Sequence, residues 1–255
     1  MVNVQTKLFF SIASNPGIFG SHLYNKAFKE LGINAIYKPL KLEPNIQLGE
    51  LVALIHQFFK KIGVCGVSVS MPFKKLAYLA VRPGDEVTDE IKIANTIVIK
   101  DNNCLSYNTD CVGFEKSCEN MLNKSKNALI FGSGSVANSI SYILKKRNID
   151  FFMTKDSENL VNRGIDLLIN ATPVGMDGFE DNVFSKKIVK DYKFVFDVVV
   201  NKETNLIRLA REQNKEWVLG WQMSKYQLME QFKLYTGQEY PEALMNVGLK
   251  ELGYE

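Results

Sequence analysis

The stretch ALIFGSGSVA, residues 128–137, decides the fold of this chain. Its first four residues are apolar and predict a buried strand, and a Gly-x-Gly turn and an amphipathic helix follow. In such a unit Gly132 allows a tight turn, Gly134 lets a pyrophosphate approach the backbone, and the small Ala137 permits close helix packing. The free N–H groups at the helix start then face the phosphates. The stretch predicts a dinucleotide-binding unit, and a tight turn without a ligand is the alternative.

The end of the next predicted strand, residues 150–154, indicates which dinucleotide binds. An acidic residue about 20 positions beyond the first glycine binds the ribose 2′-hydroxyl of NAD, whereas a cation there suits the 2′-phosphate of NADP. The chain has Thr154-Lys155-Asp156 at this point. Lys155 favours NADP and Asp156 favours NAD, while a solvated surface lysine is the alternative. We expect NADP, with NAD as the second possibility.

Upstream of this unit, strands and helices alternate in the hydrophobic pattern. The predicted order is strand 7–12, helix 21–31, strand 33–38, helix 46–60 and strand 64–69. This β-α-β-α-β order predicts a parallel sheet covered by helices. Two short strands at 95–99 and 104–107 then form a hairpin.

A helix over residues 111–122 and a polar linker over 123–127 lead into the second unit, and helices over 223–237 and 241–252 follow it. We therefore predict an α/β fold with two domains. Residues 1–109 and 222–255 form an N-terminal α/β substrate domain, to which the C-terminal helices return. Residues 110–221 form a Rossmann-type dinucleotide-binding domain.

Composition and charge exclude several classes of protein. The chain has 255 residues, of which 46% are hydrophobic and 23% charged, as in an average soluble globular protein. Its 31 basic and 28 acidic residues give a net charge of +3, too near neutral to favour nucleic acid or an anionic membrane as partner. No stretch reaches the roughly 18 apolar residues of a membrane span. We expect a cytoplasmic monomer or homodimer that binds a small molecule.

The scarcity of histidine limits the chemistry. The chain has two histidines, His22 and His56, and four cysteines, Cys65, Cys104, Cys111 and Cys118. The cysteines contain no Cys-x-x-Cys pair, so we expect reduced thiols and no metal site. Proton transfer then falls to Lys, Asp, Tyr or Glu.

Two polar clusters provide such residues. The stretch SVSMPFK, residues 68–74, ends a strand, projects Ser68 and Ser70 to one side, and delivers Lys74 to the start of a helix. The stretch YNTD, residues 107–110, ends the hairpin with Asp110. A lysine beside a carboxylate can shuttle a proton, so Lys74 and Asp110 are candidate partners. Two unrelated surface residues are the alternative.

Taken in order, these stretches resemble the shikimate dehydrogenase family over nearly the whole chain. The matching stretches are VSMPFK at 69–74, ANTI at 94–97, NTD at 108–110, GSGSV at 132–136, NATPVGM at 170–176, and GWQM at 220–223 followed by Gln227. The resemblance implies two α/β domains and a cleft that holds a cyclohexene carboxylate and NADP(H).

The resemblance also implies roles for individual residues. Lys74 is the implied catalytic acid/base and Asp110 its partner. The implied substrate ligands are Ser21, Ser68, Ser70, Asn95 and Gln227. The implied cofactor-binding residues are Gly132, Ser133, Gly134, Ser135, Val136, Thr154, Lys155, Thr172, Val198, Gly220 and Met223.

The chain also departs from the family pattern. Of an N-terminal Ser-x-Ser only Ser21 aligns, Ser68 and Ser70 stand where Asn and Thr are common, and Val200 replaces a frequent Tyr. Lys155 replaces a frequent Arg, which binds phosphate bidentately, so a weaker preference for NADP is expected. These departures indicate a divergent subgroup.

The leading hypothesis is a reversible NADP(H)-dependent reduction of 3-dehydroshikimate to shikimate, a step in chorismate and aromatic amino-acid biosynthesis. A quinate or quinate/shikimate dehydrogenase that uses NAD(P) is the alternative within the same chemistry. A regulatory homologue that binds the dinucleotide without turnover is the alternative from another class.

Overall fold

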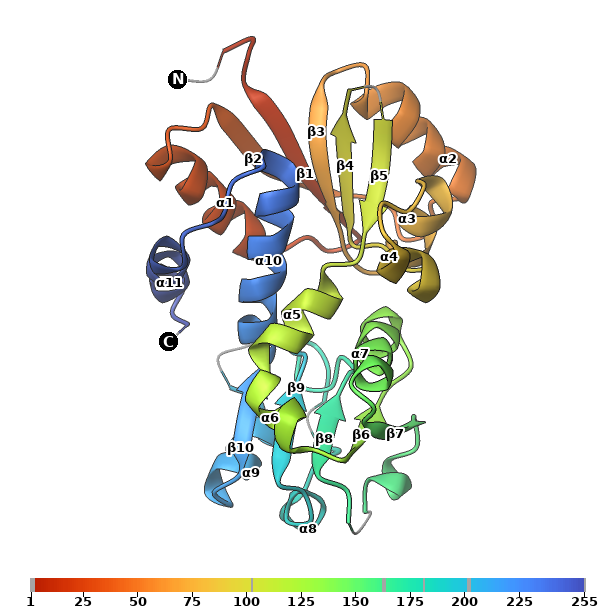
Figure 1. Ribbon diagram of the computed structural model, residues 1–255, viewed down its shortest axis with the longest axis vertical. Coiled ribbons are helices and arrows are strands. Elements are labelled where there is room, and N and C mark those ends of the chain that lie inside the picture. Colours follow the sequence, from red (N-terminus) through yellow and green to blue (C-terminus); the bar gives the residue numbers. More distant parts are fainter. Residues whose placement is uncertain (1–2, 102, 162–163, 181, 201–202, 255) are drawn as a thin grey trace. The chain divides into compact units, whose positions relative to one another are not determined.

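The computed structural model describes residues 3–101, 103–161, 164–180, 182–200 and 203–254, and the chain forms two compact units (Figure 1). The first unit contains the chain up to Thr109 and again from Leu228 onward, whereas the second runs from Asp110 to Gln227. Each unit has its own five-stranded sheet covered by helices. The α/β class predicted from the sequence is confirmed.

The first unit contains a mixed sheet. Its elements are β1 (Lys7–Ala13), α1 (Phe19–Glu30), β2 (Ala35–Lys41), α2 (Leu48–Val52), the π-helix η1 (Ala53–Phe59), β3 (Val64–Val69), α3 (Lys74–Ala80), α4 (Glu86–Ile91), β4 (Thr96–Lys100), β5 (Asn103–Tyr107), the end of α10 (Gly220–Thr236), and α11 (Glu242–Glu251). The strand order is β2-β1-β3-β4-β5. The first three strands in this order are parallel, whereas β4 is antiparallel to β3 and also to β5, with which it forms the predicted hairpin.

Helices cover both faces of this sheet. On one face the buried residues Ile55, Phe59 and Ala77 of η1 and α3 pack against β1 and β3. On the other face α1 and α10 contribute stacked aromatic rings, and Tyr235 of α10 packs against β1 and β3. Gly66 of β3 makes room for Tyr235, since a Cβ at this position would lie 2.5 Å from its ring. Gly66 therefore lets α10 approach the sheet closely.

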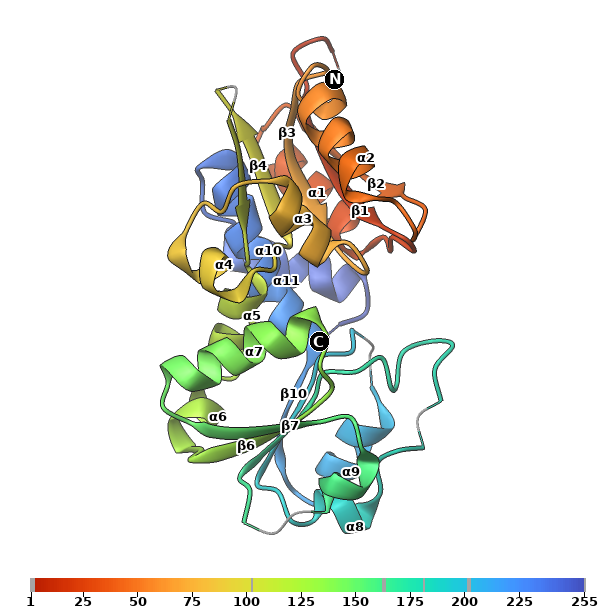
Figure 2. The same cartoon turned by 90° about the vertical axis from the view of Figure 1, so that its right-hand side faces the viewer.

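The second unit contains a fully parallel sheet. Its elements are α5 (Asp110–Ser117), α6 (Glu119–Lys124), β6 (Asn127–Phe131), α7 (Ser135–Lys146), β7 (Asp150–Thr154), the 3-10 helix η2 (Ser157–Leu160), β8 (Leu167–Asn170), α8 (Lys186–Val189), β9 (Phe194–Asp197), α9 (Asn205–Glu212), β10 (Glu216–Leu219), and the start of α10. The strand order is β10-β9-β8-β6-β7, with α5 and α7 on one face and α8 and α9 on the other (Figure 2). The order reverses between β6 and β8, where dinucleotides bind in folds of this type.

Local structure departs from the sequence-based expectation in three places. The helix expected over residues 46–60 consists of α2 followed by η1, in which the Lys60 N–H donates to the Ile55 carbonyl. The helix expected over residues 111–122 is divided near Cys118, because the side chains of Ser117 and Cys118 both bond to the Phe114 carbonyl at 3.0 Å. The expected linker shortens to residues 125–126, between α6 and β6. No helix within the described part of the chain has the length and apolar character of a membrane span.

Candidate active site

Two backbone hydrogen bonds in the first unit join the segment that ends at Lys74 to the segment that contains Asn95. Lys74 begins α3 and is 8% exposed, and its carbonyl accepts a hydrogen bond from the Ala94 N–H at 3.0 Å. The carbonyl of Asn95 accepts a hydrogen bond from the Val69 N–H, at the end of β3, at 2.7 Å. Two motifs that are separate in the sequence thus meet at the carboxyl end of β3.

The side-chain amide of Asn95 has a fixed orientation. Asn95 is 1% exposed, and its Oδ1 accepts hydrogen bonds from the Thr109 N–H at 2.9 Å and from the Thr109 hydroxyl at 3.0 Å. The Thr96 hydroxyl donates to the same oxygen at 2.9 Å. Because these donors surround Oδ1, the Nδ2 group of Asn95 points away from Thr96 and Thr109.

Asp110 follows Thr109 directly and is the first residue of α5 and of the second unit. It is 3% exposed. A carboxylate in the first turn of a helix is stabilised by the helix dipole. The predicted proton-handling pair thus consists of two buried residues, each of which begins a helix.

Ser68, a predicted substrate ligand, has partners inside the first unit. Its hydroxyl donates to Oε1 of Gln231 at 3.1 Å and lies 3.0 Å from the hydroxyl of Tyr235. Burial raises the pKa of Tyr235, and burial also raises the pKa of Tyr37, a neighbour of Ser68, to about 12. Both tyrosines therefore stay protonated at neutral pH and remain hydrogen-bond donors.

The other predicted substrate ligands lie in different settings. Ser70 is exposed beyond the end of β3, and its N–H donates to the Ile12 carbonyl at 2.9 Å. Ser21 lies in α1, and its hydroxyl donates to the Ile18 carbonyl at 2.9 Å. Gln227 is half-buried in α10 and is the last residue of the second unit.

The predicted phosphate loop forms between β6 and α7. Gly132 has φ of +124°, donates its N–H to the Thr154 carbonyl at 2.8 Å, and lies where a Cβ would be 2.6 Å from the Ala171 carbonyl oxygen. Gly134 is exposed, and a Cβ there would have no neighbour within 4 Å. The loop therefore has a crowded first glycine at positive φ and an open second glycine at the start of a 12-residue helix. This geometry fits a pyrophosphate group.

Other predicted cofactor residues gather at the same edge of this sheet. The Ala171 N–H donates to the Phe131 carbonyl at 2.8 Å, and the Val198 N–H donates to the Asn170 carbonyl at 3.0 Å. A Cβ on Gly220 would collide with the Val198 carbonyl. These contacts place the ends of β6, β8, β9 and β10 side by side. The predicted residues in this edge or its adjoining turns are Gly132, Ser133, Gly134, Ser135, Val136, Thr154, Thr172, Val198 and Gly220, and the buried Met223 lies in the first turn of α10.

The turn after β7 separates the roles of Lys155 and Asp156. The Asp156 N–H donates to the Thr154 hydroxyl at 3.0 Å, and the Asp156 carboxylate accepts the Glu158 N–H at 2.9 Å. Asp156 thus caps η2 with its own carboxylate. Lys155 is exposed beside it. This arrangement leaves Lys155 as the charged residue suited to a phosphate.

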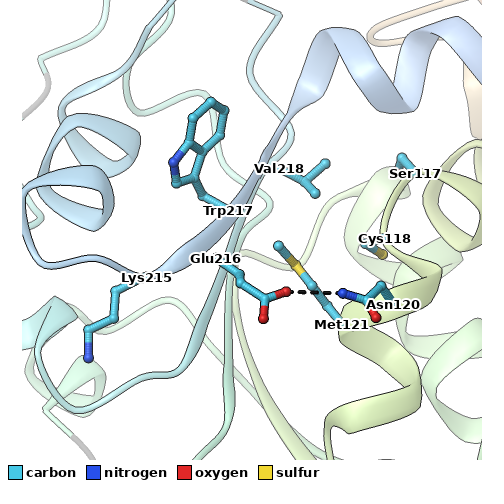
Figure 3. Close-up of a pocket in the computed structure, with 8 residues that line it drawn as sticks. All are labelled: Ser117, Cys118, Asn120, Met121, Lys215, Glu216, Trp217 and Val218. Carbon is cyan, nitrogen blue, oxygen red and sulfur yellow. Dashed lines mark hydrogen bonds between the residues drawn. The ribbon is translucent and has the colours of Figure 1, made fainter.

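A hollow of about 320 Å³ lies elsewhere in the second unit, between the α5–α6 segment and β10 (Figure 3). Its polar wall is occupied, since Glu216 accepts hydrogen bonds from Asn120 at 3.1 Å and from Lys124 at 3.0 Å. Burial raises the pKa of the lining Cys118 thiol, so this thiol stays protonated and unreactive. The hollow lies at the first residue of β10, away from the strand ends that carry the predicted cofactor residues.

Gln231 is not among the site residues predicted from the sequence, although it lies one helical turn beyond Gln227 in α10. Gln231 is fully buried and contacts Ser68 together with the Asn95–Thr96 segment. The four-residue spacing of two glutamines in one helix is the signal that could have shown it, since residues four apart share a helix face.

Comparisons with known proteins relate the chain to one family. The family model described as shikimate dehydrogenase substrate binding domain matches residues 19–97. A shikimate dehydrogenase (NADP(+)) from Pyrococcus abyssi is 30% identical, with 91% of this chain and 92% of the relative covered. A shikimate dehydrogenase-like protein from Haemophilus influenzae is 28% identical over 96% of each chain. The solved structure of a shikimate 5-dehydrogenase-like protein matches with a TM-score of 0.85 and 27% identity, over 98% of both chains.

Proposed function

The chain belongs to the shikimate dehydrogenase family, and from this premise we propose that it catalyses the reversible, NADP(H)-dependent reduction of 3-dehydroshikimate to shikimate. This reaction is an oxidoreductase step of chorismate and aromatic amino-acid biosynthesis. The observation that supports it most directly is that backbone hydrogen bonds bring the segment of the buried Lys74 and the segment of the buried Asn95 together at the end of β3. The first unit then acts as the substrate domain and the second as the NADP-binding domain.

The chemistry assigns a task to each residue. When bound, NADP+ supplies the hydride acceptor for the carbon that carries the substrate hydroxyl. Lys74 takes the proton of that hydroxyl as the hydride leaves, and returns it in the reducing direction. Asp110 is the partner of Lys74 in this transfer, and Asn95 donates its amide N–H to a substrate hydroxyl. A single positioned proton acceptor and a fixed substrate geometry suffice for this reaction.

The test is the formation of reduced nicotinamide by the purified chain, with shikimate or quinate and with NADP+ or NAD+ in turn. We expect the highest kcat/KM with shikimate and NADP+. A higher value with quinate would reassign the substrate, and cofactor binding without turnover of either acid would favour a regulatory homologue. A cytoplasmic location and a monomeric or homodimeric state remain predictions.

Alanine in place of Lys155 is expected to lower kcat/KM with NADP+ by about tenfold and to leave the value with NAD+ unchanged, because one charged hydrogen bond to the 2′-phosphate is lost. The measurement is the ratio of the two kcat/KM values. Lys187→Ala, which removes an exposed lysine elsewhere in the second unit, is the control. An unchanged ratio in Lys155→Ala would show that Lys155 does not recognise the 2′-phosphate.

A further inference from the structure

Gln231 occupies the centre of a closed hydrogen-bond network in the first unit. The side chain is fully buried in α10, and its Oε1 accepts hydrogen bonds from the Tyr24 hydroxyl at 2.9 Å and from the Ser68 hydroxyl at 3.1 Å. Its Nε2 donates to the Asn95 carbonyl at 3.1 Å and to the Thr96 hydroxyl oxygen at 2.7 Å. All four hydrogen-bonding positions of this amide are therefore satisfied.

The orientation of the Gln231 amide follows from its partners. The carbonyl of Asn95 can only accept a hydrogen bond, so the nitrogen of Gln231 faces it and the oxygen faces Tyr24 and Ser68. On the nitrogen side, the hydroxyl oxygen of Thr96 must accept. Two contacts then remain for the single hydroxyl proton of Thr96, the Oδ1 of Asn95 at 2.9 Å and the Thr109 hydroxyl oxygen at 3.2 Å, and Oδ1 of Asn95 is the nearer acceptor.

A chain of hydrogen bonds leads from Gln231 to Asn95, the predicted substrate ligand. Gln231 donates to Thr96, and Thr96 donates to Asn95. The bond from Thr96 and the two bonds from Thr109 together hold Oδ1 of Asn95 as an acceptor, so the Nδ2 group of Asn95 points away from Thr96 and Thr109. Gln231 also binds the Asn95 carbonyl that accepts the Val69 N–H, so it supports the strand end that leads to Lys74.

We propose that Gln231 is a positioning residue of the active site, which orients the Asn95 amide as a hydrogen-bond donor to substrate through Thr96. The inference rests on the proposed function, in which Asn95 binds a substrate hydroxyl. Gln231 has no direct contact with substrate in this scheme. Because it acts through Asn95, a predicted substrate ligand, its effect is on the binding of the hydroxy acid and not on the binding of the cofactor.

The decisive variant is Gln231→Glu, which keeps the shape of the side chain and replaces the donor with a carboxylate. An ionised carboxylate can only accept, so it draws the Thr96 proton away from Asn95 and faces the Asn95 carbonyl unfavourably. Burial raises the pKa of a carboxyl group, and the protonated form regains one donor. The ionisable groups around this position are Tyr24 of α1, Tyr37 of β2 and Tyr235 of α10, and burial raises the pKa of each, so they stay neutral in the assay range.

We expect Gln231→Glu to raise KM for shikimate by about three- to tenfold at neutral pH, as for the loss of one hydrogen bond, with KM for NADP+ unchanged. The ratio of variant to wild-type kcat/KM should rise as the pH is lowered. Tyr24→Phe is the matched control, because it removes a bond to the oxygen of Gln231 and leaves the donor side intact. This control should lose thermal stability without a change in KM for shikimate.

The outcomes separate the inference from the proposed function. Wild-type protein that turns over no cyclohexane or cyclohexene hydroxy acid overturns both. Active wild-type protein, together with a folded Gln231→Glu variant whose KM for shikimate is unchanged at every pH, overturns the inference alone. If Gln231→Glu does not fold, Thr96→Val tests the same relay, and an unchanged KM for shikimate in that variant also overturns it. A raised, pH-independent KM in Thr96→Val supports the relay.

Discussion

Alanine in place of Lys74 is expected to lower kcat for shikimate oxidation by about 10²–10⁴-fold, the range that one positioned acid or base contributes. Without Lys74, the hydroxyl proton has no acceptor at the moment when the hydride leaves. The affinity for NADP+ should stay at the wild-type value, because the phosphate loop is built entirely within the second unit. Steady-state kinetics give the first quantity, and a fluorescence titration of NADPH gives the second.

The next residue provides the control for this experiment. Lys75 carries the same charge as Lys74 and lies in the same helix, but it is exposed. Lys75→Ala should therefore keep the wild-type kcat. If Lys74→Ala retained most of its turnover, Lys74 could not be the acid/base. If both variants lost turnover equally, a general effect of charge or of helix stability would explain the loss.

Alanine in place of Gly134 is expected to weaken NADP+ binding by about tenfold or more, equivalent to about 1.4 kcal/mol. A Cβ at this position meets no protein atom within 4 Å, so it can obstruct only a group that enters from solvent. The thermal midpoint of the cofactor-free variant should therefore match that of the wild type. Unchanged NADP+ affinity in a folded Gly134→Ala protein would exclude this loop as the pyrophosphate site.

Gly132→Ala is the structural counterpart. Its φ of +124° is unfavourable for alanine, and the added methyl group would lie 2.6 Å from the Ala171 carbonyl oxygen. This variant should lose about 1–3 kcal/mol of folding stability even without cofactor. The two glycines of one short motif thus have separable functions, one in the fold and one in ligand access.

The phosphate loop was predictable from the sequence because every relevant interaction is local. The strand, the turn glycines and the helix start lie within ten consecutive residues, 128–137. The hairpin expected from strands 95–99 and 104–107 is likewise a local feature and is present as β4 and β5. Residue type and spacing alone determine such features.

The surroundings of Ser68 could not be predicted in the same way. Its partners Gln231 and Tyr235 lie in α10, far along the chain, and their contact depends on how closely that helix packs against β3. Gly66 permits this packing, but the sequence alone shows only a small residue within a strand and does not indicate which helix approaches it. The fixed orientation of Asn95 likewise depends on Thr109, which the strand pairing of β4 and β5 brings to it.

The helix α10 has a consequence for the synthesis of the protein. The second unit consists of one continuous segment that ends at Gln227, and the first unit needs the later residues from Leu228 onward. A chain emerging from the ribosome therefore presents a complete second unit while the first still lacks Gln231 and its aromatic neighbours. Since domains generally fold as units during synthesis, the part of the chain made first is completed last. Until then Tyr24 and Ser68 lack their native partner, and the aromatic rings of α1 that pack against α10 stay uncovered.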